Sequence, residues 1–150
     1  MLRMLKFYPD QIVRNWEKIG YAIEQALPPI VDSHKAEGRM NRILESILAG
    51  KIEVHVFVVY TDERPTVYGI VSTAITNAVD SDNKELLIYS LYASHSLNRE
   101  LIFEGLELIK KYARSQECAA ISGYTNIAGL KRLIENAGGS SSFTYLRLEV

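Results

Sequence analysis

The segment ELLIYSLYA, residues 85–93, constrains the fold more than any other part of the sequence. A strand made of these residues is apolar on both faces, so both faces must be buried. Such a strand lies inside a sheet that has helices packed on each side. The sequence therefore predicts an α/β protein in which residues 85–93 form a central strand of a mixed sheet.

The residues before this strand change periodicity twice. Residues Leu2–Tyr8 are short and apolar enough for a first strand. A helical spacing follows at Ile12, Trp16, Ile19, Ile23 and Leu27, and Pro28 with Pro29 ends that helix. A second helix has an apolar stripe at Met40, Ile43, Leu44, Ile47 and Leu48, with Gly50 placed as its C-terminal cap. Two β-branched and aromatic segments, Ile52–Tyr60 and Thr66–Ile75, then predict an antiparallel hairpin.

The residues after the central strand predict two more helices. Residues 99–114 form a helical pattern with Gly105 on its buried side, which favours close approach to a strand. Residues 118–125 predict a buried strand, residues 126–138 a helix that begins at Asn126, and residues 143–150 a final strand. The predicted order is β-α-α-β-β-β-α-β-α-β, in one domain that covers residues 1–150.

Composition and charge argue against several functions. A net charge of −1 is not that of a nucleic-acid-binding surface. The single Cys118 lies in an apolar stretch, which favours a buried thiol and leaves no internal disulfide. No metal is expected, because the three histidines lack Cys or His partners at ligand spacing: His34, His55 and His95. We expect His55 to be half-buried and hydrogen-bonded. With no membrane-length apolar run and no signal-peptide pattern, we expect a cytoplasmic protein without membrane partners.

The order of elements and the stretch CAAISGYTNIAGLKRLIENAGG, residues 118–139, resemble the Gcn5-related N-acetyltransferase (GNAT) superfamily. The resemblance covers nearly the whole chain. The short length of the chain and its ending, TYLRLEV, are similar to those of phage-encoded members of this superfamily. The resemblance implies an N-acyltransferase that moves an acetyl group from its co-substrate, acetyl-CoA, to the primary amine of a small molecule or peptide by direct attack.

The resemblance also implies where acetyl-CoA binds. The backbone of Leu91, Tyr92 and Ala93 would pair with the pantetheine arm. The pyrophosphate would lie at the start of the next helix, against Ser94, His95, Ser96, Asn98 and Arg99, and Asn126 would reach the CoA arm. A helix N-terminus is a general anion site. The family loop Arg/Gln-x-x-Gly-x-Gly/Ala is replaced here by SHSLNR, which has no glycine, so the alternative is that these residues only cap the helix.

The catalytic residues match the family less closely and stay unassigned. Many members place a tyrosine acid in the helix after the fifth strand, where this chain has Leu133 and Ile134. Tyr124 is close to this helix in sequence and could substitute as the acid, although a tyrosine near the end of a buried strand is more often a core residue. No general base is identified. The acceptor would lie over residues 28–39 and the hairpin.

The alternative function is a GNAT-fold module that has lost catalysis and serves in binding or assembly, in a phage particle or in its contact with the host. The glycine-free loop and the missing tyrosine favour this alternative. In either case the predicted final strand, Thr144–Val150, could pair with a second copy to form a homodimer.

Overall fold

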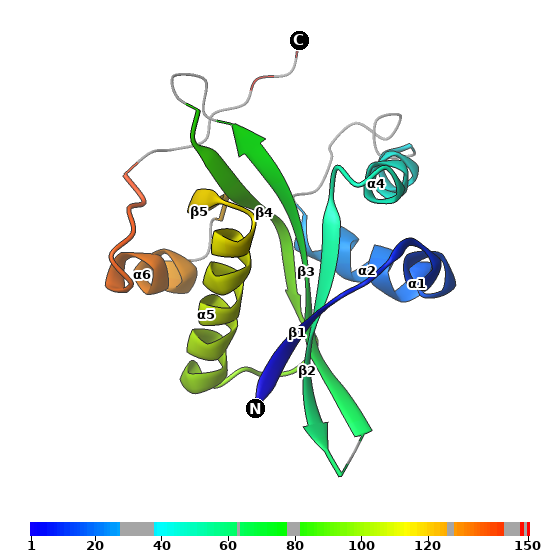
Figure 1. The fold of residues 1–150 in the computed structure, drawn as a ribbon, viewed down its shortest axis with the longest axis horizontal. Helices are drawn as coiled ribbons and strands as arrows, with labels where there is room; N and C mark the ends of the chain where they lie inside the picture. The colour runs from blue at the N-terminus through cyan, green and yellow to red at the C-terminus, as the bar shows by residue number, and fades with distance from the viewer. Residues whose placement is uncertain (28–37, 63, 78–81, 126–127, 143–147, 149) are drawn as a thin grey trace.

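The computed structural model describes residues 1–27, 38–62, 64–77, 82–125, 128–142, 148 and 150. Its strands are β1 (Leu2–Lys6), β2 (Glu53–Thr61), β3 (Arg64–Asn77), β4 (Lys84–Ala93) and β5 (Cys118–Gly123). Its helices are α1 (Pro9–Arg14), α2 (Trp16–Ala26), α4 (Arg39–Leu48), α5 (Arg99–Ser115) and α6 (Ala128–Asn136). Figure 1 shows the sheet edge-on between these helices.

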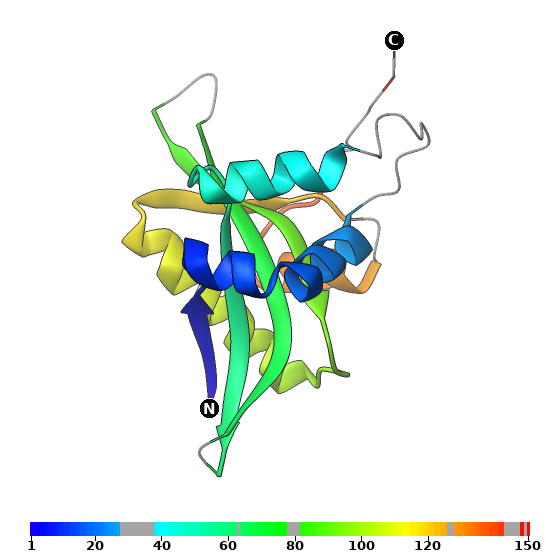
Figure 2. The same ribbon diagram turned by 90° about the vertical axis from the view of Figure 1, so that its right-hand side faces the viewer.

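The strands form one five-stranded sheet in the order β1-β2-β3-β4-β5. The first four pair antiparallel, and β5 joins β4 in parallel through the crossover helix α5. Helices α1, α2 and α4 cover one face and α5 the other (Figures 1 and 2). Strand β4 is therefore internal and covered on both faces, as its two-sided apolar sequence predicted.

Each face of the sheet has its own apolar core. On the α5 side the buried residues are Leu2, Phe57, Val71, Leu86, Ile109 and Ala113. On the side of α1, α2 and α4 they are Ile12, Ile19, Ile23, Ile43, Ile47 and Val54. The β2 sequence supplies both sets because successive side chains of a strand point to opposite faces.

The first predicted helix is divided into α1 and α2. Asn15 separates them with φ −111° and ψ 15°, outside the α-helical region. Its amide still donates to the Gln11 carbonyl at 3.1 Å, and its own carbonyl accepts from Lys18 and Ile19 at 3.1 and 3.0 Å. The prediction of one continuous helix was wrong. The apolar spacing persists across the break, so periodicity alone did not reveal it.

The helix ends follow the sequence more closely. Gly50 has φ +76°, its amide donates to the Ile47 carbonyl at 3.0 Å, and the Lys51 amide donates to the Ser46 carbonyl at 2.9 Å. This pair of bonds is the Schellman arrangement that an αL glycine permits. The predicted cap at Gly50 is confirmed.

Three other expectations differ from the structure or lie outside it. Cys118 is partly exposed, because it begins the outermost strand of the described sheet. The predicted strand at residues 118–125 ends at Gly123. The predicted final strand falls mainly on residues 143–147 and 149, which are outside the described residues.

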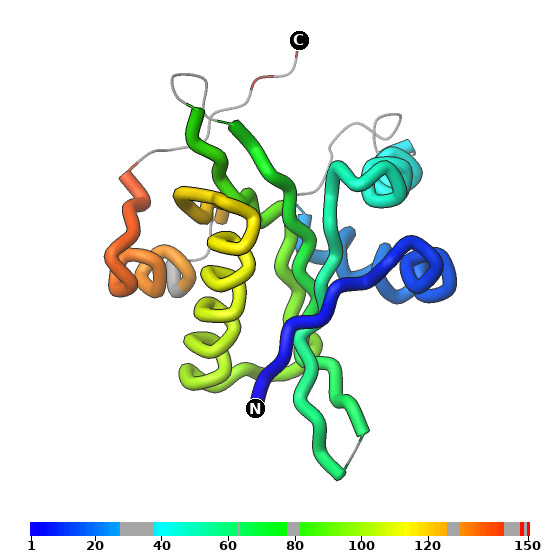
Figure 3. Tube along the Cα trace, viewed as in Figure 1, coloured from blue at the N-terminus to red at the C-terminus, as the bar shows by residue number. Residues whose placement is uncertain are grey.

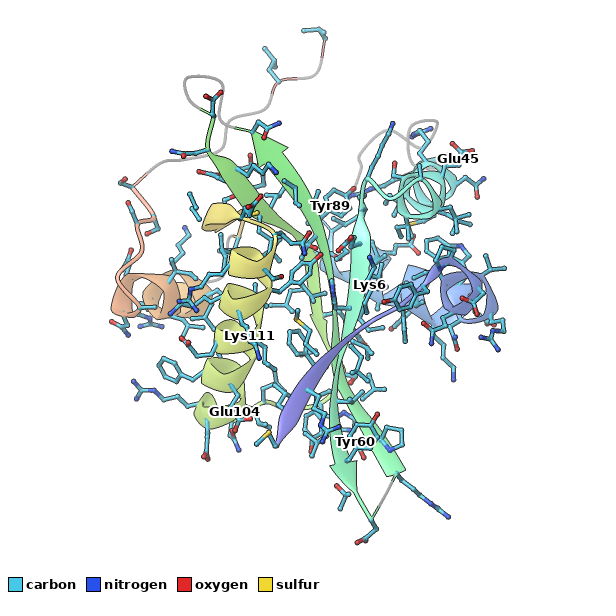
Figure 4. The ribbon with its side chains drawn as sticks, in the orientation of Figure 1. Lys6, Glu45, Tyr60, Tyr89, Glu104 and Lys111 are labelled. Carbon is cyan, nitrogen blue, oxygen red and sulfur yellow. The ribbon has the colours of Figure 1, made fainter. Side chains whose placement is uncertain are left out.

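Helix α5 lies along the first strand, as the tube in Figure 3 shows. The Leu2 amide donates to the Glu104 carboxylate at 3.2 Å, and Glu104 is labelled on α5 in Figure 4. Gly105 faces this contact: a Cβ there would lie 3.8 Å from Leu2 Cδ2 and 3.9 Å from Phe57 Cε1. Gly105 faces the sheet as predicted, but the approach is not close enough to require glycine, because these ordinary contact distances leave room for a methyl group.

Gly105→Ala is therefore expected to raise the free energy of unfolding by about 0.5–1 kcal/mol, since alanine is the better helix former and meets no clash. Gly69→Ala is the matched opposite case, because its Cβ would lie 2.7 Å from the Tyr92 carbonyl oxygen. We expect it to lower the free energy of unfolding by roughly 1–3 kcal/mol. Urea denaturation of both variants measures this, and equal effects would contradict the packing described.

Candidate functional site

The central feature of the site is the unequal pairing of β4. Along one edge β4 pairs with β3 from Lys84 to Ala93. Along the other edge it pairs with β5 only from Lys84 to Ile88, whose partner is Gly123. Among the described residues, Tyr89–Ala93 have no strand on that edge. We call the opening between residues 89–93 of β4 and the end of β5 at Gly123 the fork.

The backbone of β4 presents hydrogen-bonding groups to the fork. The Ser94 amide donates to the Tyr68 carbonyl of β3 at 3.0 Å. Because N–H and C=O groups alternate between the two edges of a strand, those of Leu91 and Ala93 point to the opposite edge. The Leu91 side chain is 46% exposed, although it lies inside the sheet. Within the described residues, the fork therefore combines apolar surface with backbone donors and acceptors that have no strand partner.

A β-bulge marks the inner end of the fork. Ser72 pairs with Ser90 and Thr73 pairs with Ile88, so Tyr89, labelled in Figure 4, is the extra residue of β4. The hydroxyls of Ser72 and Ser90 are hydrogen-bonded to each other. Their residues are 0% and 5% exposed, so this polar pair lies in the core. It ties β3 to β4 at the position where β5 departs.

The loop that follows β4 is held to β3 by side chains. The Ser94 hydroxyl donates to the Val67 carbonyl at 2.8 Å and lies 3.2 Å from His95 Nδ1. The His95 ring stacks at a tilt on Tyr68, with 5.3 Å between centroids. The Ser94 hydroxyl already has protein partners.

Helix α5 begins at the end of this loop. The Asn98 Oδ1 accepts from the Leu101 amide at 2.8 Å, so Asn98 is the N-cap. Asn98 thus caps the helix, as its residue type and position predicted, and its part in cofactor binding stays a prediction. The first amides of the 17-residue helix have no intrahelical acceptor and carry the positive end of its dipole. Arg99 is exposed in the first turn, and its Cζ atom lies 5.6 Å from the Phe103 ring centroid.

The structure brings most of the predicted cofactor residues together. Leu91, Tyr92, Ala93, Ser94, His95, Ser96, Asn98 and Arg99 form one path from the fork to the start of α5. Asn126 lies outside the described residues, as does most of the predicted acceptor segment, residues 28–37. Tyr124 follows directly after β5 and is 70% exposed, so it is not a core residue.

Sequence reasoning missed an aromatic pair on the α2 side of the fork. The Tyr21 ring of α2 meets the Tyr92 ring edge-to-face, with 6.1 Å between centroids and 81° between planes. Tyr21 is 56% exposed. The sequence did contain a signal for this pair. Tyr21 is an aromatic residue on the polar face of an amphipathic helix, where exposure to water favours charged residues.

His55 was expected to be half-buried and hydrogen-bonded, and that expectation was wrong. It is 3% exposed, and its Nδ1 has no hydrogen-bond partner in the part of the chain that the structure describes. Its ring lies 4.5 Å from that of Tyr112 on α5, on the face away from α2. Burial lowers the pKa of His55, partly offset by the nearby Glu53 carboxylate, while Lys6 lowers the pKa further.

A polar cluster surrounds His55 at the other end of α5 from the fork loop. Glu53 accepts from the Tyr112 hydroxyl and from Lys6 Nζ, the latter at 3.0 Å. A cavity of about 250 Å³ adjoins it, lined by Gly50, Lys51, Glu53, Thr73, Ala74, Ile75 and Tyr112. The cluster is separate from the fork.

The described residues supply no metal site and no membrane helix. No group of three or more His, Cys, Asp or Glu side chains in this part of the chain is placed to hold a metal ion. None of the helices in the same residues is long and apolar enough to cross a membrane.

A comparison with family models finds no match, and neither does one with curated proteins. Solved structures do match. The chain is similar to an aminoglycoside acetyltransferase from an uncultured soil metagenomic sample, with TM-score 0.67 and 15% identity over 100% of this chain and 99% of that one. It is also similar to a GNAT family acetyltransferase from Staphylococcus aureus, with TM-score 0.66 and 9% identity over 99% and 98%. A predicted acetyltransferase with acetyl-CoA from Clostridium acetobutylicum has TM-score 0.66 and 13% identity over 99% and 96%.

At these identities the similarity shows the fold alone. The chain forms a single α/β domain with a mixed five-stranded sheet, parallel between β4 and β5, of GNAT-like fold. The predicted fold class is confirmed.

The serine pair predicts a non-additive effect on stability. Ser72→Ala or Ser90→Ala alone leaves a buried hydroxyl unpaired and is expected to lower the free energy of unfolding by roughly 1–3 kcal/mol. The double variant removes both hydroxyls and is expected to cost no more than either single change. Urea denaturation of the single and double variants measures these free energies. Ser115→Ala, at an exposed position of α5, is the control, and its effect should add to that of either serine change. Additive costs for Ser72 and Ser90 would contradict the pairing.

The buried His55 predicts loss of stability in mild acid. Its pKa is lowered from 6.5 in the folded protein, so the unfolded chain binds the proton more readily as pH falls below that value. We expect the urea midpoint to be flat above about pH 7 and to fall as pH drops through 6.5 toward the folded pKa. His55→Phe should flatten this slope and His95→Asn should keep it. An unchanged slope in His55→Phe would exclude His55 as the cause.

Proposed function

We propose that this protein is an N-acetyltransferase that transfers the acetyl group of acetyl-CoA to a primary amine by direct attack. One observation carries the proposal: the unpaired edge of β4 leads into the N-terminus of α5, a 17-residue helix. An extended ligand with a polar arm and an anionic end matches these two features in order. The similarity in fold to acetyltransferases supports the same function.

In this proposal the pantetheine arm lies in the fork and takes the place of the missing strand. Its amides bond the backbone groups of Leu91 and Ala93, which point to the open edge. The exposed Leu91 side chain provides apolar contact for the methylene groups. Tyr92 contributes through its backbone, which lies between those of Leu91 and Ala93.

The pyrophosphate then lies at the start of α5. The first-turn amides that Asn98 does not cap and the helix dipole attract an anion there, and Arg99 adds a positive charge. Ser94 and Asn98 already hydrogen-bond the protein, so they shape the loop and leave the phosphate contacts to the backbone, His95, Ser96 and Arg99. Asn126 is proposed to reach the CoA arm, as in the family that the sequence resembles.

The reaction needs little from side chains. The nitrogen lone pair of the neutral amine attacks the carbonyl carbon of the thioester, and a C–N bond forms. The C–S bond then breaks, the amine nitrogen loses a proton, and the CoA thiolate takes up a proton to leave as the thiol. Positioning of amine and thioester provides much of the rate, and water can carry the proton. We assign no catalytic acid or base, although Tyr124 is exposed beside the fork.

A second candidate is a GNAT-fold binding or assembly module without catalysis, including one in a phage particle. The loop supports it: it contains no glycine, and its Ser94 and Asn98 side chains have structural partners. Pairing of residues 144–150 between two copies would serve either function and stays a prediction.

Thermal unfolding with acetyl-CoA separates the two candidates. Ligand at about 100 times its dissociation constant adds roughly 2.7 kcal/mol of stability, which is a Tm increase of roughly 5–10 °C for a chain of this size. We expect this increase in the wild type. Arg99→Ala should weaken it by removing a phosphate contact, and Arg114→Ala, at the far end of α5, should not.

A flat Tm at millimolar acetyl-CoA would reject the enzyme and favour the binding module. Equal shifts in wild type and Arg99→Ala would remove Arg99 from the site while leaving the proposal intact.

A further inference from the structure

A pocket lies at the other end of α5 from the fork loop. It is the cavity of about 250 Å³ beside the contact of Glu53 with Tyr112. Its walls come from the last turns of α5, the start of β2, the later part of β3 and the turn after α4. We call it the β3 pocket. Its volume is below the roughly 300–1,000 Å³ of sites for drug-sized ligands, so a molecule that fills it is small.

Strand β3 runs past the start of β2 at this pocket. The register between the two strands ends where Glu53, the first residue of β2, pairs with Thr73. Residues 74–77 continue to pair with β4 on the opposite edge of β3. Among the described residues no strand pairs with the edge that β2 leaves, so its backbone donors and acceptors have no strand partner there. Ala74 and Ile75 belong to this stretch and line the β3 pocket.

Thr73 adds a buried polar side chain without a partner. It is directly opposite Glu53 in the register, so both side chains lie on the face of the sheet that α5 covers. Thr73 is 3% exposed and lines the β3 pocket, and its hydroxyl has no hydrogen bond to any described residue. Buried hydroxyls in proteins are in the large majority hydrogen-bonded. A polar group of a ligand in the pocket would supply this partner.

Two opposite charges line the same pocket. Glu53 accepts from Lys6 and Tyr112, and a carboxylate has about four acceptor positions, so a further donor can bond to it. Lys51 is exposed and forms no ion pair within the described part of the chain. A simple anion would be repelled by Glu53 and a simple cation by Lys51. A small molecule that carries both an ammonium and a carboxylate group matches the two charges together.

We propose that the β3 pocket binds a free α-amino acid with an apolar side chain. The ammonium group of the ligand bonds Glu53. Its carboxylate bonds Lys51 and accepts from the Thr73 hydroxyl. Its side chain contacts Ile75, an apolar residue that is 45% exposed. This is a second site, separate from the fork, and the inference does not rest on the proposed acetyl transfer.

The test uses L-leucine and two analogues that each lack one charge. Isopentylamine has no carboxylate and isocaproate has no ammonium group, and both keep the branched apolar end. Binding to the protein without acetyl-CoA is measured from NMR shifts of the backbone amides of residues 50–53 and 73–75, with those of residues 91–93 reporting on the fork. The variants are Thr73→Val and Lys51→Gln, and Lys18→Gln at an exposed position of α2 is the matched control.

We expect leucine to shift the amides of residues 50–53 and 73–75 saturably at millimolar concentration and to leave those of residues 91–93 unchanged. Each analogue should bind roughly tenfold more weakly, because it loses a hydrogen bond between charged groups. Thr73→Val should raise the Kd for leucine roughly two- to tenfold. Lys51→Gln should raise it roughly two- to fivefold, as expected for an exposed charge contact, and Lys18→Gln should bind as wild type.

Three results would overturn the inference. They are the absence of saturable shifts at residues 50–53 and 73–75, equal affinity for leucine and either analogue, and wild-type affinity for leucine in either variant. Lys51 is exposed, so Lys51→Gln tests the site even where Thr73→Val lowers stability. None of these results bears on acetyl transfer, which the thermal unfolding with acetyl-CoA tests separately.

Discussion

The architecture of the site depends on β4 being paired along its full length on one edge and along half of it on the other. Its register with β3 runs to Ala93, but its pairing with β5 stops at Ile88. A strand interior to a sheet normally satisfies its backbone groups on both sides. Here residues 89–93 pair with β3 but not with β5, so within the described part of the chain the backbone groups at their other edge have no strand partner.

Strand β3 must therefore hold β4 firmly, and three features do so. The Ser72–Ser90 hydroxyl pair joins the strands in the core at the bulge. The Ser94 amide and hydroxyl bond β3 carbonyls beyond the last strand residue. Gly69 brings its backbone close to the Tyr92 carbonyl, where any side chain would clash. Each feature lies on the β3 side of β4, opposite the fork.

The sequence predicted the elements whose signals are local. Two-sided apolar character located β4, and the αL cap at Gly50 and the N-cap at Asn98 follow from residue type and position. It did not predict the break at Asn15, because the apolar spacing continues across it. It could not place His55 or join Tyr21 to Tyr92, since burial and contact between residues far apart in the chain depend on packing that no local pattern encodes. The candidate site was thus predictable along β4 and its loop, but not on the α2 side.

The two sides of the fork differ in chemistry. The start of α5 has backbone amides, a helix dipole and Arg99, a combination that attracts anions. On the other face the Tyr21 and Tyr92 rings meet edge-to-face, so that side is aromatic. Both features border residues 89–93 of β4. If acetyl transfer takes place here as proposed, most of its rate would come from positioning the amine against the thioester along this one stretch of backbone.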